Sequence, residues 1–332
     1  MTSDSARNRV GALAFLAGLV AVPFARYPSI AGADWDTYRN GIAAVLDGRG
    51  LYRQDLALGS YDYLSAEFAN AYNMPPWFAP VALPILAMPD VLERPAWILV
   101  TGLILVAAFA LVMPLGDRVI WVALAASMSF AWMALTWGNA SALVALGIAI
   151  WMAGLRRHAP WMEVAGIVVA SIKIVPAIPL VVYHLQTRNV RPLLLAAAVL
   201  AGISGILMVW TGTNVVLEFA IAFSNIRQVS ETNLAPASLL APALPGLDLV
   251  FIVRILSIAA LVWLAAQPPS LYRVAAMELV VCGLVSNVYA FWLLHPVIAA
   301  LGAVRADEES IVEESTPESH EEASTTSRSL VG

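Results

Sequence analysis

The main feature of this sequence is a series of long apolar segments separated by short polar ones. A transmembrane helix needs about 20 mostly apolar residues, and the apolar stretches here approach or exceed that length. Their approximate bounds are 10–24, 95–114, 119–136, 140–155, 161–184, 193–212, 248–266 and 274–302. The pattern predicts an all-α polytopic membrane protein with about 9–11 transmembrane or half-spanning helices.

Three apolar segments carry interruptions that alter this picture. The stretch 76–89 is short and rich in proline, which favours a re-entrant or interfacial element over an ordinary span. The segment 161–184 is expected to consist of two short helices that meet near Lys173. The segment 274–302 is expected to divide in the same way near Asn287.

Basic residues set the expected orientation, because cytoplasmic loops of membrane proteins carry an excess of arginine and lysine. With the N-terminus inside, the short basic loops fall in the cytoplasm. The longer mixed loops, 31–94 and 213–247, then fall outside. The first apolar segment also has the shape of a signal peptide, since two arginines precede it and residues 31–33 imitate a cleavage site. In either case residue 34 emerges outside the cytoplasm.

The composition agrees with a membrane protein and excludes several other classes. Hydrophobic residues make up 60% of the chain and charged residues 12%, with a mean hydropathy of +0.78. Soluble proteins average about 25% charged residues. A DNA-binding protein, a secreted disulfide framework and a cytosolic enzyme are therefore excluded, and no nucleic-acid partner is expected. The single cysteine, Cys282, forms no intramolecular disulfide.

The net charge of −5 originates at the C-terminal end of the chain. Residues 306–332 hold eight acidic residues and one arginine, with few apolar residues. Such a composition predicts a disordered acidic tail, which the orientation places in the cytoplasm. The remaining integral membrane domain, residues 1–305, holds 15 acidic and 17 basic residues and is close to neutral.

Two carboxylates, Asp34 and Asp36, follow the first apolar segment on its predicted outer side. Tyr38 then begins a stripe of apolar residues at helical spacing, which is typical of a helix lying on the membrane interface. Either carboxylate is suited to cap that helix, predicted over 38–47. On residue types alone the cap is favoured, and the alternative is a general base towards a hydroxyl at the membrane surface. Two acids are weak evidence for a metal site, so the need for a divalent metal stays open.

Lys173 is the only lysine of the chain and lies inside an apolar stretch. A charge within a span is costly and by default faces a cavity or a partner. Pro176 and Pro179 follow, so a broken helix is expected to expose backbone groups beside the ammonium group. That compact charge suits phosphate. The alternative is a lysine at the outer end of a short helix that snorkels to the surface.

Other polar residues lie between apolar flanks. Arg227 and Asn233 belong to a long outer loop, which is either an amphipathic surface helix or a polar lid with Arg227 as a phosphate ligand. His295 lies within an apolar run and is suited either to packing or to orienting a sugar or phosphate oxygen. Asn139 follows a glycine at an outer turn and is interpreted as a turn residue.

Taken in order, several short motifs resemble glycosyltransferase family 87. They are Asp34-x-x-x-Tyr38 with Leu46-Asp47-Gly48-x-x-Leu51-Tyr52, the segment Tyr72 to Pro84, Gly138-Asn139, Lys173-x-x-Pro176 and Asn233-x-x-x-x-Ser238. Two positions depart from the family pattern, since Asn73-Met74 replaces the usual start of the Tyr-Pro-Pro segment and Asn139 replaces glutamine. The C-terminal motif also departs from it, because Trp292 and His295 stand at a different spacing. The resemblance covers roughly residues 10–300.

This family includes polyprenyl-phosphate-mannose-dependent mannosyltransferases of the GT-C type. The resemblance therefore implies a GT-C-like helical bundle that transfers a hexose, in the first place mannose, from a polyprenyl-phosphate donor. The acceptor is a hydroxyl of a lipid or glycan on the extracytoplasmic side of the cell membrane. No cofactor beyond this donor is implied, and membrane lipids are the surrounding partners.

The resemblance also assigns roles to residues. Asp34 matches the position of the family's catalytic base. One base and a phosphate leaving group suffice for the reaction, so the transfer is expected to invert the anomeric carbon. Lys173, together with Arg227, is expected to neutralise the departing phosphate, an electrostatic role that is often the largest contribution to catalysis. His295 is a further candidate contact. The expected substrate-binding set is completed by Asp36, Tyr38 and Asn233.

Two other functions fit the same features. A transporter or flippase of a lipid-linked or small polar substrate also predicts a buried lysine, broken helices and polar outer turns. The long outer loop with its Asp-x-x-x-Tyr motif and the absence of an internal repeat favour an enzyme over this class. A non-catalytic family member acting as a partner subunit is the second alternative, because the motifs at Asn73, Asn139 and His295 are altered.

Overall fold

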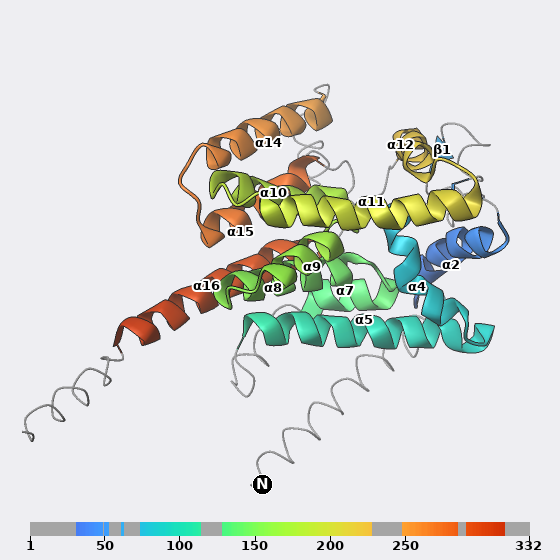
Figure 1. The fold of residues 1–332 in the computed structure, drawn as a ribbon, viewed down its shortest axis with the longest axis horizontal. Helices are drawn as coiled ribbons and strands as arrows, with labels where there is room; N and C mark the ends of the chain where they lie inside the picture. Colours follow the sequence, from blue (N-terminus) through green and yellow to red (C-terminus); the bar gives the residue numbers. More distant parts are fainter. Residues whose placement is uncertain are drawn as a thin grey trace, which may run out of the picture.

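The computed structural model describes residues 31–48, 50–52, 61–62, 74–113, 128–227, 248–284 and 290–315 (Figure 1). Within these ranges the regular secondary structure is helical apart from one pair of two-residue parallel strands. The all-α class predicted from the sequence is therefore confirmed for the described residues. The first apolar segment, predicted over 10–24, lies outside them.

The elements follow one another in a simple order. The first part of the chain forms α2 (Ala33–Leu46), β1 (Tyr61–Asp62), the 3-10 helix η1 (Pro76–Phe78), α4 (Ala79–Leu86), α5 (Asp90–Val112), α7 (Met128–Trp137) and α8 (Ser141–Arg156). The middle forms α9 (Pro160–Ala170), α10 (Ile174–Gln186), α11 (Arg191–Thr211), α12 (Val215–Asn225) and β2 (Ile226–Arg227). The last part forms α14 (Leu249–Ala265), α15 (Leu271–Val281), η2 (Cys282–Leu284), η3 (Ala290–Leu293) and α16 (Leu294–Ser315).

Helix α8 lies at the centre of the bundle and packs against α5, α9 and α16. Glycines allow its backbone to approach α9 closely. A Cβ atom at Gly147 would come within 2.4 Å of the backbone nitrogen of Ala170, and one at Gly166 within 2.5 Å of Trp151. Small residues at a helix crossing permit such contact. This packing holds the C-terminal end of α9, and with it the neighbouring Lys173, against α8.

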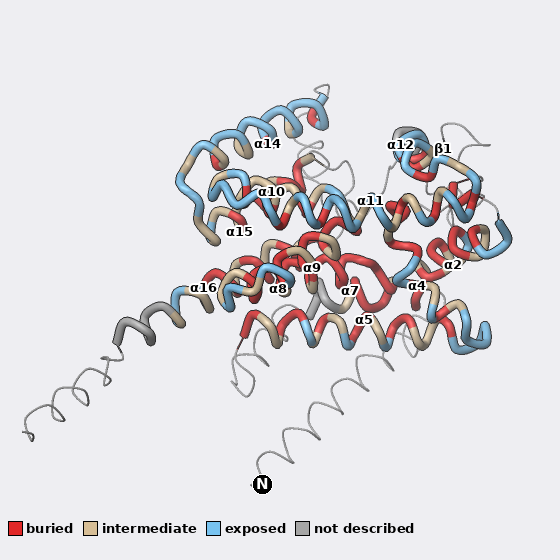
Figure 2. The backbone as a smooth tube through the Cα atoms, in the orientation of Figure 1, coloured by how far each residue is buried: buried red, intermediate tan, exposed pale blue. Residues whose placement is uncertain are grey.

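Two described helices, α5 and α11, are long and apolar enough to cross a membrane by length and composition. Helices α11 and α14 contain many exposed residues (Figure 2), and large apolar residues are among them. On α11, Ile206 is 68% exposed and Val209 is 87% exposed. Extended apolar faces of this kind favour contact with lipid over contact with water. The number of crossings and their orientation stay predictions.

The predicted helix interruptions can be compared with the structure. The division near Lys173 is confirmed, because α9 ends at Ala170 and α10 begins at Ile174. The proline-rich segment forms only the short helices η1 and α4, as expected for an element that does not span the membrane. The second predicted division, at Asn287, lies outside the described residues.

One boundary was predicted wrongly. The sequence suggested a disordered tail from residue 306, but α16 continues to Ser315. Tertiary contacts hold the first part of this stretch: the Tyr272 hydroxyl of α15 donates to Asp307 at 2.7 Å, and Arg156 of α8 pairs with Glu309 at 3.4 Å. These contacts supply the stabilisation that composition alone does not reveal. Residues 316–332 lie outside the described residues.

Candidate active site

Helix α2 begins earlier than the sequence suggested, and this changes the role of its acidic residues. Gly32, in the left-handed conformation with φ 71°, precedes the first helical residue, Ala33. The Gly32 amide donates to the Thr136 carbonyl at 2.7 Å, which ties the start of α2 to the end of α7. Asp34 and Asp36 therefore lie in the first turn and do not cap a helix over 38–47. Being two residues apart, they point to sides of α2 that differ by about 200°.

Asp34 is joined to Lys173 through one amide side chain. The Asn139 Nδ2 atom donates a short hydrogen bond to Asp34 Oδ2, and its Oδ1 atom accepts from Lys173 Nζ at 3.0 Å. The two polar ends of the amide thus bind groups of opposite charge. The amide therefore bridges the Asp34 carboxylate and the Lys173 ammonium group.

The turn that carries Asn139 is fixed by backbone and aromatic contacts. Gly138 has φ 66°, and a Cβ atom there would lie 2.7 Å from the Trp97 ring, so glycine is required on both counts. Trp97 Nε1 donates to the Gly138 carbonyl at 2.6 Å. The Tyr38 hydroxyl accepts from the Ala140 amide at 3.1 Å. Tyr38 is 2% exposed, so it supports this turn from within the core.

Lys173 reaches this group from the break between α9 and α10. Its Nζ atom donates to Ser141 Oγ at 2.8 Å and lies 4.6 Å from the centre of the Trp292 ring. The ring face offers a weak counter-charge to the ammonium group. Nearby, the Trp77 indole donates to the Ser171 carbonyl at 3.0 Å, which occupies one backbone acceptor of the break. The lysine points into the cluster, so the snorkelling alternative does not describe it.

His295 completes the cluster from the start of α16. It is 1% exposed, and its ring lies 5.7 Å from that of Trp292. Its Nε2 atom has no hydrogen-bond partner among the described residues. Buried polar atoms of native proteins nearly always have a partner, so one without a partner at this place is suited to contact a ligand.

The electrostatics of the cluster favour a proton acceptor. Asp34 is half-buried but surrounded by protein atoms, and this burial raises the pKa of its carboxyl to about 6. The Asn139 hydrogen bond and the positive charge of Lys173 act in the opposite direction on that pKa. At neutral pH the group is mostly ionised yet basic enough to take a proton. Such a pKa is favourable for a general base.

A comparison with known proteins identifies the family. The model of glycosyltransferase family 87 matches residues 72–301. The chain belongs to glycosyltransferase family 87. No curated protein and no solved structure matches it significantly.

The matched segment divides the cluster of this family 87 chain into two parts. Asn139, Lys173 and His295 lie within it, whereas Asp34 and Tyr38 precede its first residue. The resemblance inferred from the sequence began near residue 10, so its most specific motif is outside the match. The support for Asp34 is therefore its geometry.

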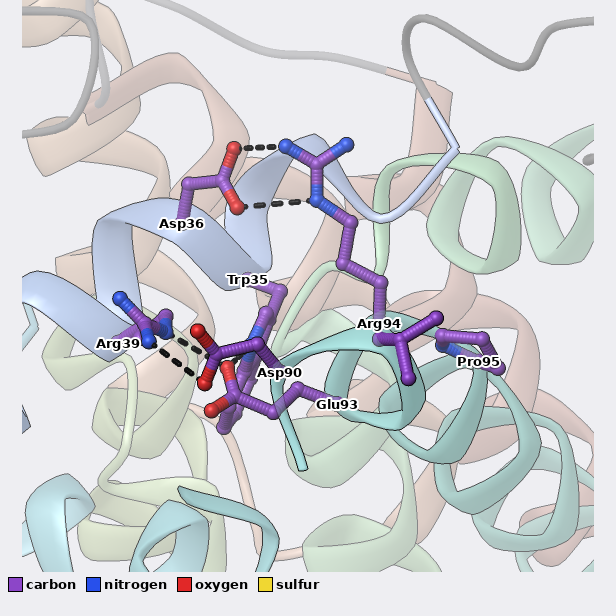
Figure 3. Close-up of a pocket in the computed structure, with 8 residues that line it drawn as sticks. Trp35, Asp36, Arg39, Asp90, Glu93, Arg94 and Pro95 are labelled. Carbon is purple, nitrogen blue, oxygen red and sulfur yellow. Dashed lines mark hydrogen bonds and ion pairs between the residues drawn. The ribbon is translucent and has the colours of Figure 1, made fainter. Parts of the chain in front are cut away.

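Asp36 lies apart from Asn139, on the side of α2 that faces α5. Both of its oxygens accept from the Arg94 guanidinium, and the Arg94 Nε bond measures 3.0 Å (Figure 3). A two-pronged pair between neighbouring helices fixes their spacing. We infer that Asp36 positions α2 against α5, which differs from the substrate contact predicted from the sequence.

A second ion-pair group adjoins this contact. Arg39 donates to Glu93 at 2.7 Å and to Asp90 at 3.2 Å, and the Trp35 indole donates to Glu93 at 2.9 Å (Figure 3). These residues and the Asp36–Arg94 pair, together with Val91 and Pro95, line a cavity of about 370 Å³. Each drawn charge has a partner of opposite sign, so the group holds α2 onto the first turn of α5.

The remaining two predicted contacts, Arg227 and Asn233, stay predictions. Arg227 occupies β2, where its backbone is in register with Asp62 of β1. Asn233 lies outside the described residues. Within the described ranges no group of three or more His, Cys, Asp or Glu residues is arranged to hold a metal ion.

Three members of the cluster were missed or undervalued in the sequence. Asn139 was interpreted as a turn residue, and Ser141 and Trp292 were not singled out as site residues. Local signals exist for two of them. Ser141 is the first residue of α8 after the Asn139 turn, and Trp292 stands three residues before His295. That spacing puts two side chains on one face of a helical segment.

Proposed function

We propose that this protein transfers a hexose, in the first place mannose, from a polyprenyl-phosphate donor to a hydroxyl of a lipid or glycan acceptor. Membership of glycosyltransferase family 87 supports sugar transfer. The observation that carries the proposal is the Asn139 amide, which holds a carboxylate and an ammonium group together in one polar cluster. In sugar transfer from a phosphate, a base accepts the proton of the acceptor hydroxyl and a cation stabilises the leaving phosphate.

In the proposed reaction Asp34 accepts the proton of the acceptor hydroxyl. The acceptor oxygen forms a bond to the anomeric carbon as the bond from that carbon to the phosphate oxygen breaks. The electron pair of the broken bond leaves with the lipid phosphate. Attack from the side opposite the phosphate inverts the anomeric carbon, because a single displacement takes place.

Lys173 stabilises the charge that develops on the departing phosphate. Its ammonium group already has two oxygen acceptors, Asn139 Oδ1 and Ser141 Oγ, which hold it in place before the donor binds. Preorganised charges of this kind contribute strongly to catalysis because little reorganisation is needed in the transition state.

His295 offers a further contact to the donor. Its Nε2 atom is buried beside Trp292 and lacks a partner among the described residues, so a phosphate or sugar oxygen is a suitable ligand. Arg227 and Asn233 remain predicted donor contacts. The divalent metal also remains open: the proposed displacement uses only side chains, and no cofactor is proposed.

The apolar exterior supports a donor with a long isoprenoid tail. The apolar faces of α11 and α14 would contact lipid, and a donor tail lying in the same lipid would bring its phosphate to a site between the helices. We place the site on the extracytoplasmic side, with the N-terminus and the acidic tail in the cytoplasm. The distribution of arginines is the support for this orientation.

The test uses the purified chain in lipid with a panel of radiolabelled polyprenyl-phosphate hexoses and membrane lipid extract as acceptor. We expect label to pass to the acceptor from one donor, with the opposite anomeric configuration in the product. The matched control is the nucleotide-linked form of the same hexose, from which no transfer is expected. Transfer from the nucleotide donor, or retention of configuration, would contradict the proposed reaction. A donor that binds but is not transferred would favour the partner-subunit alternative, and movement of a donor across the bilayer would favour the flippase.

A further inference from the structure

A second cavity lies at the far end of the bundle from Asp34, where α5, α8 and α16 meet. Its volume is about 180 Å³, and its apolar wall is formed by Ala110, Leu111 and Met113 at the C-terminal end of α5. Its charged wall is formed by three arginines, Arg156, Arg157 and Arg305, and one acid, Glu309. The lining therefore carries an excess of positive charge.

The pairing of these charges leaves donors available. Glu309 is shared by Arg305 at 2.6 Å and Arg156 at 3.4 Å. The Arg156 side chain is only 10% exposed, and its Nε atom has no hydrogen-bond partner among the described residues. Arg157 is exposed and has no ion pair within the described part of the chain. The lining thus holds three guanidinium groups and one carboxylate, which pairs with two of them, and this arrangement is suited to an anion with several oxygens.

Two described acids beside Glu309 are not part of the cavity. Asp307 accepts from the Tyr272 hydroxyl of α15 at 2.7 Å, so it is directed to another helix. Glu308 is exposed and is not part of the cavity lining. Among the described residues, the lining of the cavity therefore keeps three arginines against one acid.

An apolar stripe leads from this cavity along the outside of α5. Leu99 is 45% exposed and Leu103 48% exposed, Ala107 is exposed, and Leu111 then lines the cavity. These residues follow one another at intervals of four, so they lie on one face of the helix. A ligand with a charged head and an apolar tail fits the cavity and the stripe together. Free phosphate would use only the cavity.

The cavity and the candidate active site lie near opposite ends of α5. Arg94, which pairs with Asp36 beside that site, and Leu111 are separated by roughly 25 Å along the helix axis at its standard rise. This distance approaches the thickness of the hydrocarbon core of a bilayer, about 30 Å. A lipid bound here would therefore lie in the other leaflet from the sugar donor.

We propose that this cavity binds the phosphate headgroup of an anionic phospholipid, whose acyl chain lies along the Leu99–Leu111 face of α5. The proposal is independent of the sugar-transfer reaction. It requires that α5 contacts lipid and that its C-terminal end faces the cytoplasm, as in the orientation proposed above. Basic pockets between helices at the cytoplasmic end of membrane proteins are suited to acidic lipid headgroups.

The experiment measures lipid retention by the full chain. The protein is reconstituted into nanodiscs of phosphatidylglycerol and phosphatidylcholine in equal amounts, and bound lipid is counted by native mass spectrometry after release. We expect one phosphatidylglycerol to be retained in preference to phosphatidylcholine. Arg157→Gln should reduce that retention about fivefold, because a single arginine contact to an anionic lipid is lost.

The matched control is Arg191→Gln, since Arg191 is also exposed, lies at the start of α11 and is absent from the cavity lining. Its retention of phosphatidylglycerol should equal that of the parent chain. Equal retention of the two lipids by the parent, or an equal loss in both variants, would overturn the proposal. In a third arm, inorganic phosphate is added to the parent chain in phosphatidylcholine nanodiscs, and phosphatidylglycerol is added afterwards. If phosphate is retained and phosphatidylglycerol does not displace it, the cavity binds free phosphate instead of a lipid.

Discussion

The two polar groups on either side of α2 differ in how their charges are paired. On the side facing α5, Asp36 and Arg94 form a direct two-pronged pair, and Glu93 is held by Arg39 and Trp35. On the other side, Asp34 and Lys173 are joined only through the neutral amide of Asn139. Direct pairing neutralises the charges and holds the two helices, α2 and α5, together. The amide instead holds a carboxylate and an ammonium group in one cluster, where we propose that they act on a substrate.

The two groups also differ in whether all of their polar atoms have partners. Among the described residues of the first group, each charge has an opposite partner within hydrogen-bond distance. The second group contains a buried histidine nitrogen without a partner in the described part of the chain. We therefore expect substitutions on the α5 side to change stability and substitutions on the Asn139 side to change transfer.

The largest effect among the neighbours of Asp34 is expected at Lys173. Lys173→Met removes the charge that stabilises the departing phosphate, and kcat should fall by about 10²–10³. The measurement is the rate of label transfer at saturating donor. Arg94→Gln is the control on the other side of α2, and its transfer rate should stay within about threefold of the parent. An equal loss in both variants would remove the distinction between the two groups.

Asn139→Ala is expected to shift the pH profile. Asp34 acts as a base only when ionised, so transfer should be lost as the pH falls through the pKa of this carboxyl, which is about 6. The Asn139 hydrogen bond lowers this pKa, so its removal should move the acidic limb of kcat/KM to higher pH. The check is transfer measured across the pH range for both proteins. An unchanged limb would show that the titrating base is another group.

A smaller effect is expected at His295. His295→Ala removes one hydrogen bond to the donor, so KM for the donor should rise about three- to tenfold while kcat changes little. Donor titrations of both variants give the two constants separately. A fall in kcat with unchanged KM would place the histidine in the chemical step and not in donor binding.

The smallest effect on transfer is expected at Glu93. This residue is 2% exposed, and Glu93→Gln removes the charge that Arg39 and Trp35 contact. The free energy of unfolding should fall by about 1–3 kcal/mol, because a buried charged partner is lost. Thermal unfolding monitors this change, and transfer below the melting temperature should match the parent. Lost transfer without lost stability would assign the α5 side to catalysis.

Much of the fold was predictable because helical segments are marked locally. Apolar runs located α5, α8, α11 and α14, and the prolines after Lys173 located the break between α9 and α10. The start of α2 was not predictable, because a left-handed glycine and the hydrogen bond from Gly32 to Thr136 set it. That contact joins residues far apart in the sequence.

The candidate site was predictable only in part for the same reason. Asp34, Lys173 and His295 stand out as polar residues next to or within apolar sequence, and the structure brings them to one cluster. The role of Asn139 depends on two partners that are 105 and 34 residues away. The role of Asp36 depends on Arg94, 58 residues away. No pattern within a single segment reveals such pairings.

The most direct test of the central claim compares Asp34→Asn with Asp36→Asn. The two substitutions are identical in chemistry and two residues apart, but they lie in different polar groups. Single-turnover transfer and donor binding are measured for both variants and the parent in the same lipid. We predict that Asp34→Asn binds donor normally and transfers about 10²–10⁴ times more slowly, the usual contribution of a general base, whereas Asp36→Asn transfers at nearly the parent rate. Equal transfer by the two variants would contradict the assignment of Asp34 as the base.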